Sequence, residues 1–294
     1  MQTQGVFVPI VTPFDADNRV NLAALEQLVE RCIEQGVAGI VACGTTGEYY
    51  ALNDDEREQV LRCVARVGKG RIALVAGANA LSTQGAIERA QQAAALGYQA
   101  LMLSAPAYSL PNQAEVVAHF RTVAQASALP IILYNFPARI GVEIGFDAVV
   151  ELSKLPKIIG IKESSGNFSR ALALIKAGLP DFDVICGCDD QAADFLFWGV
   201  RGWISGGANL FPGEQAAMIR AADAGDWDRV KSLMSAMLPV IQAMESGDYN
   251  QKAKLGCRRH GIDAGPVRQP LLPLGAADAQ AFNALVEQFD QSKR

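Results

Sequence analysis

The sequence is poor in histidine, its cysteines are scattered, and it has no long apolar run. Its 294 residues include two histidines, His119 and His260, and six cysteines. These residues are not clustered at the spacing of a metal site. Only Cys186 and Cys188 lie close together, and we interpret the cysteines as small buried thiols rather than as metal ligands. No apolar stretch approaches the roughly 20 residues that a bilayer-crossing helix needs.

Other absences narrow the functional classes further. The 26 Lys and Arg residues are outnumbered by 31 Asp and Glu residues, which gives a formal net charge of -5. No basic run offers a surface for phosphate backbones, so nucleic acid is not an expected partner. Motifs for nicotinamide, flavin or nucleotide binding are missing, as is the Gly-x-Ser-x-Gly turn of serine hydrolases. The first residues lack the basic and apolar parts of a secretory signal, so we expect a cytoplasmic protein.

Eight short apolar runs alternate with segments of helical periodicity along most of the chain. The runs are rich in β-branched residues and almost continuously apolar, which is typical of parallel strands that are buried on both faces. They comprise residues 6–11, 39–43, 72–76, 100–103, 130–134, 158–162, 183–187 and 202–205. Eight strand–helix units in about 220 residues favour an α/β fold of the closed (β/α)8 type, a TIM barrel, over an open sheet.

The boundaries between these units carry helix start and stop signals. Gly36, Gly97 and Gly199 each stand between a helical segment and a strand, where a left-handed residue commonly ends a helix. Asn53 followed by Glu56 has the spacing of a capping box, which predicts a helix start.

After about residue 224 the strand pattern stops and three helices are expected. The first carries a Met-rich apolar stripe, the second spans about 250–260, and the third follows Asp278. We therefore divide the chain into a barrel with the active site, residues 1–224, and a C-terminal helical region, residues 225–294. No low-complexity linker separates them, so we expect the helical region to be docked on the barrel. Packing in a core explains the Met-rich stripe better than a binding surface does.

The loop after the second strand could bind a small anion. In a TIM barrel the functional groups gather at the carboxyl ends of the strands. Here Gly44, Thr45, Thr46 and Gly47 follow the strand end. Glycines let backbone N–H groups turn toward an anion, and threonines add hydroxyl donors. A purely structural turn explains the same residues, so this loop alone leaves both interpretations open.

Lys162 ends the sixth apolar run and is the most informative single residue. Burying an ammonium group without a charged partner is costly and favours the neutral amine, which can attack a carbonyl carbon to form an imine. The alternative is that Lys162 pairs with a carboxylate such as Glu163 or Asp189. Its position alone does not separate these two interpretations.

The fifth strand adds two further candidates. Tyr134 stands at the strand end, where a phenol can relay protons. Arg139 follows it and can form a bidentate hydrogen bond with a carboxylate. Each also has an ordinary explanation, because a tyrosine at a barrel rim often bonds to backbone and an arginine is often a surface charge.

Taken together, these residues resemble the dihydrodipicolinate synthase and N-acetylneuraminate lyase superfamily of class I pyruvate-dependent aldolases. The similarity runs over essentially the whole chain and rests on the order and spacing of several segments. These are residues 8–14, 44–48, 134–137, 160–164, 187–190 and 206–209.

The resemblance implies catalytic roles for four residues. Lys162 would form an imine with pyruvate or a longer 2-oxo acid, so that no separate cofactor is needed. Tyr134 would move protons during imine formation and during carbon–carbon bond making or breaking. Thr46 and Tyr108 would complete this proton relay, with Tyr108 often inserted from a neighbouring subunit.

The resemblance also implies substrate-binding roles. Thr45 and Thr46, with the backbone of their loop at Gly44, would hold the carboxylate of the 2-oxo acid. Arg139 would bind the carboxylate of a second substrate, and Gly187 belongs to a matching turn beside the site. A homo-oligomer, either a dimer or a tetramer, is expected from the same resemblance.

The motifs are closest to the synthase branch, which condenses pyruvate with aspartate semialdehyde to give 4-hydroxy-tetrahydrodipicolinate. Branches that cleave 2-keto-3-deoxy sugar acids, sialic acids or 4-hydroxy-2-oxoglutarate remain alternatives, as do dehydratases and deaminases that use the same imine. A non-catalytic 2-oxo acid sensor on the same fold is a more remote alternative.

Two departures from the family pattern concern assembly and regulation. Ala107 stands where synthases often carry a second tyrosine, which puts the usual stacking between subunits in doubt. Tyr49 and Tyr50 make residues 48–54 bulkier than in lysine-inhibited synthases, whose histidines are also missing here. We therefore hypothesise that lysine does not inhibit this protein.

Overall fold

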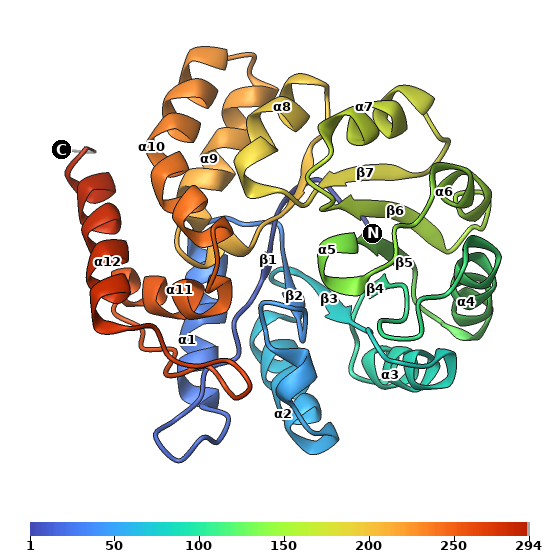
Figure 1. Ribbon diagram of the computed structural model, residues 1–294, viewed down its shortest axis with the longest axis horizontal. Coiled ribbons are helices and arrows are strands. Elements are labelled where there is room, and N and C mark those ends of the chain that lie inside the picture. Colours follow the sequence, from blue (N-terminus) through green and yellow to red (C-terminus); the bar gives the residue numbers. More distant parts are fainter. Residues whose placement is uncertain (293–294) are drawn as a thin grey trace.

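Eight parallel strands pair in chain order, and the last strand pairs with the first, so the sheet forms a closed barrel. In this computed structural model, which describes residues 1–292, helices surround the strands and three further helices lie together on one side of the barrel (Figure 1). The strands are β1 (Gly5–Pro9), β2 (Gly39–Ala42), β3 (Ala73–Gly77), β4 (Ala100–Ser104), β5 (Ile131–Asn135), β6 (Ile158–Glu163), β7 (Asp183–Cys186) and β8 (Gly202–Ile204). The predicted (β/α)8 barrel is confirmed.

The helices follow the strands in the expected alternation. Those of the barrel are α1 (Leu22–Glu34), α2 (Asp54–Gly68), α3 (Thr83–Ala95), α4 (Gln113–Ala126), α5 (Pro137–Ile140), α6 (Phe146–Leu152), α7 (Phe168–Ala177), α8 (Ala192–Phe197) and α9 (Pro212–Asp223). Those after the barrel are α10 (Trp227–Glu245), α11 (Tyr249–Gly256) and α12 (Ala276–Gln291). Short 3-10 turns are η1 (Tyr49–Ala51), η2 (Asp189–Gln191), η3 (Gly206–Asn209) and η4 (Cys257–His260).

All eight predicted strands are present, and their ends differ from the prediction by at most two residues. The first run continues to Val11 in the sequence, but β1 ends at Pro9 because the Val11 N–H is bonded to the side chain of Asn209, at 3.1 Å, instead of to a neighbouring strand. Pro130 lies outside β5, since it has no N–H for the ladder. Lys162 is not the last residue of its strand, because Glu163 also pairs with β5 and β7.

The predicted helix signals are confirmed. Gly36, Gly97 and Gly199 all have positive φ angles. Asn53 and Glu56 form a reciprocal capping box at the start of α2. The third C-terminal helix begins at Ala276, two residues before the predicted Asp278.

Side chains of alternating direction build two layers of core. Phe7, Val41, Val75, Met102 and Ile132 point inward and fill the barrel, whereas their neighbours along the strands pack against the helices. The Met-rich stripe of α10 is buried, as expected for core packing. The division into residues 1–224 and 225–294 stays our prediction. Over residues 1–292 no helix is both long and apolar enough to cross a membrane.

His119 is an uncharged histidine on the buried face of α4. It is 5% exposed, its Nδ1 lies 2.9 Å from the Thr83 hydroxyl, and its Nε2 has no hydrogen-bond partner among residues 1–292. Burial lowers the pKa of the imidazole to about 4, because the charged form would lose its hydration.

We expect the free energy of unfolding to fall as the pH drops from 6.5 toward 4. In that range an unfolded chain binds a proton at position 119 that the folded chain rejects, which corresponds to a loss on the order of 3 kcal/mol at full extent. Urea unfolding between pH 4 and 7 should therefore show a shallower pH dependence for His119→Gln than for the wild type. The remaining slope would report His260, whose pKa is also lowered to about 4, together with carboxyl groups of shifted pKa such as Glu56 and Glu245. Equal pH dependences of the unfolding free energy in the wild type and in His119→Gln would contradict the lowered pKa of His119.

Candidate active site

A cavity of about 420 Å³ opens at the carboxyl ends of the strands. Its walls come from the loop after β2, from β5 and β6, from the turns after β6, β7 and β8, and from the junction of α10 with α11. Among the predicted site residues, those that line it are Thr45, Thr46, Tyr134, Arg139, Lys162 and Gly187. The barrel therefore brings six of the eight predicted residues together.

Lys162 reaches this cavity from β6 and is 6% exposed. It pairs in register with Tyr134 of the neighbouring strand β5, and its Nζ lies 4.5 Å from the centroid of the Tyr134 ring. No carboxylate among residues 1–292 forms an ion pair with Lys162 within 4.0 Å. The amine is thus buried, unpaired and directed at the cavity.

The two carboxylates that could have neutralised Lys162 are engaged elsewhere. The Glu163 carboxylate accepts hydrogen bonds from Nε of Arg170 at 3.1 Å and from the side-chain amide of Asn135 at 2.9 Å.

Asp189 accepts three hydrogen bonds, from the Trp203 indole at 2.9 Å, the Gly207 N–H at 2.8 Å and the Tyr249 hydroxyl at 2.8 Å. The alternative of a Lys162 ion pair with Glu163 or Asp189 is therefore wrong.

The loop after β2 is held in a tight conformation. The Thr12 hydroxyl donates to the Gly47 carbonyl at 2.7 Å, and a Cβ at Gly47 would lie 2.9 Å from the Ile10 carbonyl oxygen. Thr45 and Thr46 line the cavity. Gly44 is buried and is not among the lining residues. Its predicted contact with substrate stays a prediction.

Gly187 is required by close packing. A Cβ at this position would lie 2.0 Å from the Ser164 hydroxyl and 2.8 Å from Cγ of Lys162. The next residue, Cys188, lines the cavity and is half-buried, which corrects our expectation of a buried thiol at that position. Burial raises the pKa of the Cys188 thiol to about 12, so it is uncharged at neutral pH. In residues 1–292 no group of three or more His, Cys, Asp and Glu is placed to hold a metal ion.

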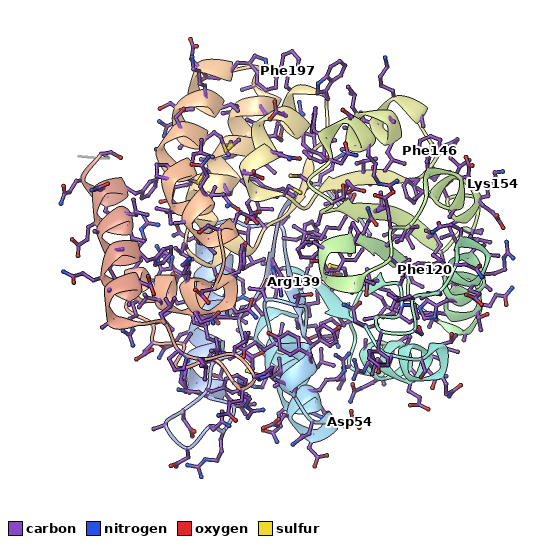
Figure 2. The ribbon with its side chains drawn as sticks, viewed as in Figure 1. Asp54, Phe120, Arg139, Phe146, Lys154 and Phe197 are labelled. Carbon is purple, nitrogen blue, oxygen red and sulfur yellow. The ribbon has the colours of Figure 1, made fainter. Side chains whose placement is uncertain are left out.

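Arg139 and Tyr108 differ in where the fold puts them. Figure 2 shows Arg139 near the middle of the molecule, inside the ring of helices, and its guanidinium lies 5.6 Å from the Phe136 ring centroid. Tyr108 is 94% exposed, has a left-handed φ of 70°, and does not line the cavity. Its own chain therefore does not bring Tyr108 into the site.

The wall from α10 and α11 was missed in the sequence. Glu245 lies at its exposed rim, where partial burial, and then repulsion from Asp189 and Asp190, raises the pKa of its carboxyl to about 7. Tyr249 and Asn250 complete this wall. The lining of the cavity thus combines the basic side chains of Lys162 and Arg139 with the acidic side chains of Asp190 and Glu245.

Comparison with known proteins agrees with this geometry. The family model described as "Dihydrodipicolinate synthetase family" matches residues 2–289. The chain belongs to this family. A relative named 4-hydroxy-tetrahydrodipicolinate synthase, from an Exiguobacterium species, is 36% identical over 292 residues, which is 99% of each chain.

Two solved structures of the dihydrodipicolinate synthetase family superpose closely. Dihydrodipicolinate synthase from Aquifex aeolicus has a TM-score of 0.93 and 30% identity, covering 98% of both chains. A chloride-inhibited dihydrodipicolinate synthase from Acinetobacter baumannii, in complex with pyruvate, has a TM-score of 0.92 and 35% identity, covering 98% of this chain and 99% of that one. Family members are class I lyases that form a lysine imine with pyruvate and use no separate cofactor, so the chain is an enzyme of this class.

Proposed function

We propose that the protein condenses pyruvate with aspartate semialdehyde, using Lys162 as the imine-forming residue. The observation that carries this proposal is the buried, unpaired Lys162 amine, 4.5 Å from the ring centroid of Tyr134. A neutral amine in this place can attack a ketone, and the tyrosine hydroxyl nearby can carry the protons that the reaction moves.

The reaction begins at the keto carbon of pyruvate. The Lys162 amine adds to this carbon, water leaves, and a cationic imine remains. Loss of a proton from the methyl group gives an enamine, whose carbon attacks the aldehyde of the second substrate, and the alkoxide that forms takes up a proton. The amine of the second substrate then attacks the imine carbon and displaces Lys162, which closes the ring of the product and frees the lysine. Tyr134 is the proposed proton carrier, and Thr45 and Thr46 are proposed to hold the pyruvate carboxylate through hydroxyl and backbone N–H groups.

The charges around the cavity favour a zwitterionic second substrate. Aspartate semialdehyde carries a carboxylate, which suits the guanidinium of Arg139. It also carries an ammonium group, which suits the acidic rim of Asp190 and Glu245. The alternative 2-keto-3-deoxy sugar acids, sialic acids and 4-hydroxy-2-oxoglutarate have no such ammonium group, which is why the synthase reaction comes first.

Tyr108 is proposed to act from a neighbouring copy of the chain, in a relay with Thr46 and Tyr134. Its exposure and its left-handed backbone leave the phenol projecting from the surface. Such a conformation is uncommon for a bulky residue and is frequent at functional sites. This supports a homodimer as the smallest active unit, with a tetramer as the expected assembly. The six free thiols suit the reducing cytoplasm, which we propose as its compartment.

Treatment with pyruvate and borohydride should trap a reduced adduct on Lys162. Mass spectrometry of digested protein is expected to find the adduct on this residue in the wild type and in Lys157→Ala, a matched control at the lysine that immediately precedes the same strand. Lys162→Ala should give no adduct and no turnover. An unmodified wild-type protein would support the sensor alternative instead.

The second substrate is identified by turnover. Aspartate semialdehyde with pyruvate should give the highest kcat/KM in a panel that includes 2-keto-3-deoxy sugar acids, sialic acid and 4-hydroxy-2-oxoglutarate. Release of ammonia or of water without carbon–carbon bond change would identify a deaminase or a dehydratase. Higher kcat/KM for any other panel member would overturn the synthase assignment while leaving the imine chemistry intact.

Tyr108→Phe should lower kcat by a factor of about 100, because it removes one proton-transferring hydroxyl. Co-expression with Lys162→Ala should recover activity, since one site of each mixed dimer then has both residues. For random pairing the recovery is about a quarter of the wild-type activity. Mixed dimers as inactive as the parents would show that Tyr108 does not act across subunits.

Lysine is expected to leave turnover unchanged at millimolar concentration. Tyr49 and Tyr50 pack edge to face, with ring centroids 5.7 Å apart, and Arg89 lies 6.0 Å from the Tyr49 ring centroid. These bulky side chains lie in residues 48–54. In lysine-inhibited synthases the same segment has small residues and histidines, which this chain lacks. A steady-state assay with and without lysine tests this, and a clear loss of rate would reject it.

A further inference from the structure

The loop that carries Thr45 and Thr46 is tied to the C-terminal region by a buried ion pair. Glu48 directly follows this loop, is 0% exposed, and has a left-handed φ of 54°. One of its carboxylate oxygens lies 2.6 Å from Nζ of Lys254, which is 2% exposed. The other accepts the Arg268 backbone N–H at 2.9 Å. Glu48 therefore has one fixed orientation.

Lys254 is equally constrained. Its Nζ also donates to the Pro266 carbonyl at 2.7 Å and lies 4.0 Å from the centroid of the Phe14 ring. Burial outweighs the attraction of Glu48 and lowers the pKa of the ammonium to about 8. A buried pair of this kind is a weak source of stability, and fixing a conformation is its better-attested use.

A second contact from the same helix face holds the other end of the loop. Asn250 and Lys254 are four residues apart in α11 and so lie on one side of it. The Asn250 amide donates to the Thr45 carbonyl at 3.3 Å and to the Tyr50 hydroxyl at 3.0 Å. Helix α11 therefore contacts the chain at Thr45 and at Glu48, on both sides of Thr46.

We propose that Glu48 and Lys254 are positioning residues, which hold Thr45 and Thr46 in the geometry that binds the carboxylate of the 2-oxo acid. The inference rests on the proposed function, since it assumes that this loop receives pyruvate. Neither side chain lines the catalytic cavity, so the pair acts through the loop and not on the substrate.

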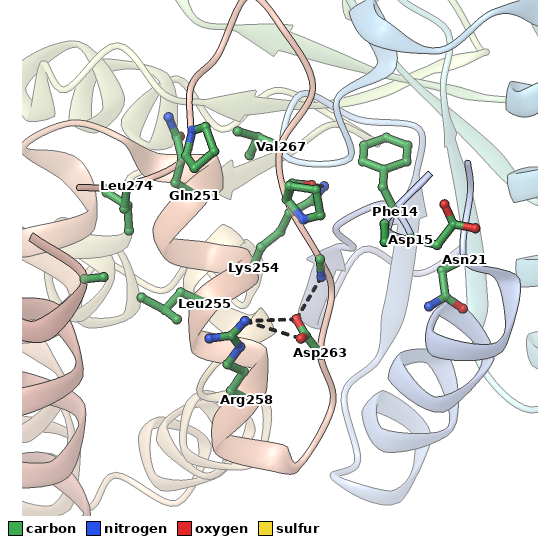
Figure 3. Close-up of a pocket in the computed structure, with 15 residues that line it drawn as sticks. Phe14, Asp15, Asn21, Gln251, Lys254, Leu255, Arg258, Asp263, Val267 and Leu274 are labelled. Atoms are coloured by element: carbon green, nitrogen blue, oxygen red, sulfur yellow. Dashed lines mark hydrogen bonds and ion pairs between the residues drawn. The ribbon is translucent and has the colours of Figure 1, made fainter. Parts of the chain in front are cut away.

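A matched control lies one turn further along the chain. Figure 3 shows Lys254 reaching toward Phe14, whereas Arg258 turns to Asp263. Both cations border an outer cavity of about 630 Å³, but Arg258 is exposed and its ion pair with Asp263 is 3.3 Å long. Arg258→Met thus removes a neighbouring cation without touching the loop.

The test measures how much pyruvate is needed to load Lys162. Borohydride trapping across a pyruvate series gives the half-saturating concentration and the adduct level at saturation. In the double variant Glu48→Gln/Lys254→Met no buried charge is left unpaired. The half-saturating concentration should rise about tenfold, with saturation still complete and kcat changed much less, because the loop binds substrate and transition state alike. Arg258→Met should match the wild type.

The outcomes separate the two proposals. A wild-type protein that forms no adduct refutes the proposed function. A wild-type protein that forms the adduct, with the double variant saturating at the same pyruvate concentration, refutes the positioning role. A fall in kcat with an unchanged half-saturating concentration refutes it too. If the double variant fails to fold by circular dichroism, Glu48→Gln alone, which retains an acceptor for the Arg268 N–H, is measured against the same criteria.

Discussion

The site depends on keeping one amine buried without a carboxylate partner. The neighbouring Glu163 is the obvious carboxylate to pair with this amine. Arg170 and Asn135 occupy that carboxylate instead, and three donors occupy Asp189. These contacts leave Lys162 available for a carbonyl substrate. The barrel provides the rest by setting Lys162 beside Tyr134 in the strand register.

The barrel could be predicted from the sequence because each strand is a short apolar run and each helix has its own start and stop signals. The exact strand ends could not. They depend on partners that are distant in the chain, such as Asn209, whose side chain takes the N–H of Val11. The extra pairing of Glu163 has the same origin, since both adjacent strands extend beside it.

The candidate site divides in the same way. Residues near the carboxyl ends of strands, such as Thr46 and Lys162, were found because these ends meet at one face of a barrel. The wall formed by Glu245, Tyr249 and Asn250 was missed, because these residues approach the barrel only through tertiary packing and no local pattern marks them. The role of Tyr108 came from family resemblance alone, since a residue that serves a neighbouring copy has no partner in its own chain.

The hydrogen bond between Asn250 of α11 and Thr45 in the loop after β2 joins positions 205 residues apart. A ribosome therefore releases the strands and the Lys162 amine well before it releases the helix that closes the cavity. A nascent chain carries the reactive group without the wall that shapes its pocket. The wall of this cavity is therefore complete only after α11 has been synthesised and has packed against the loop.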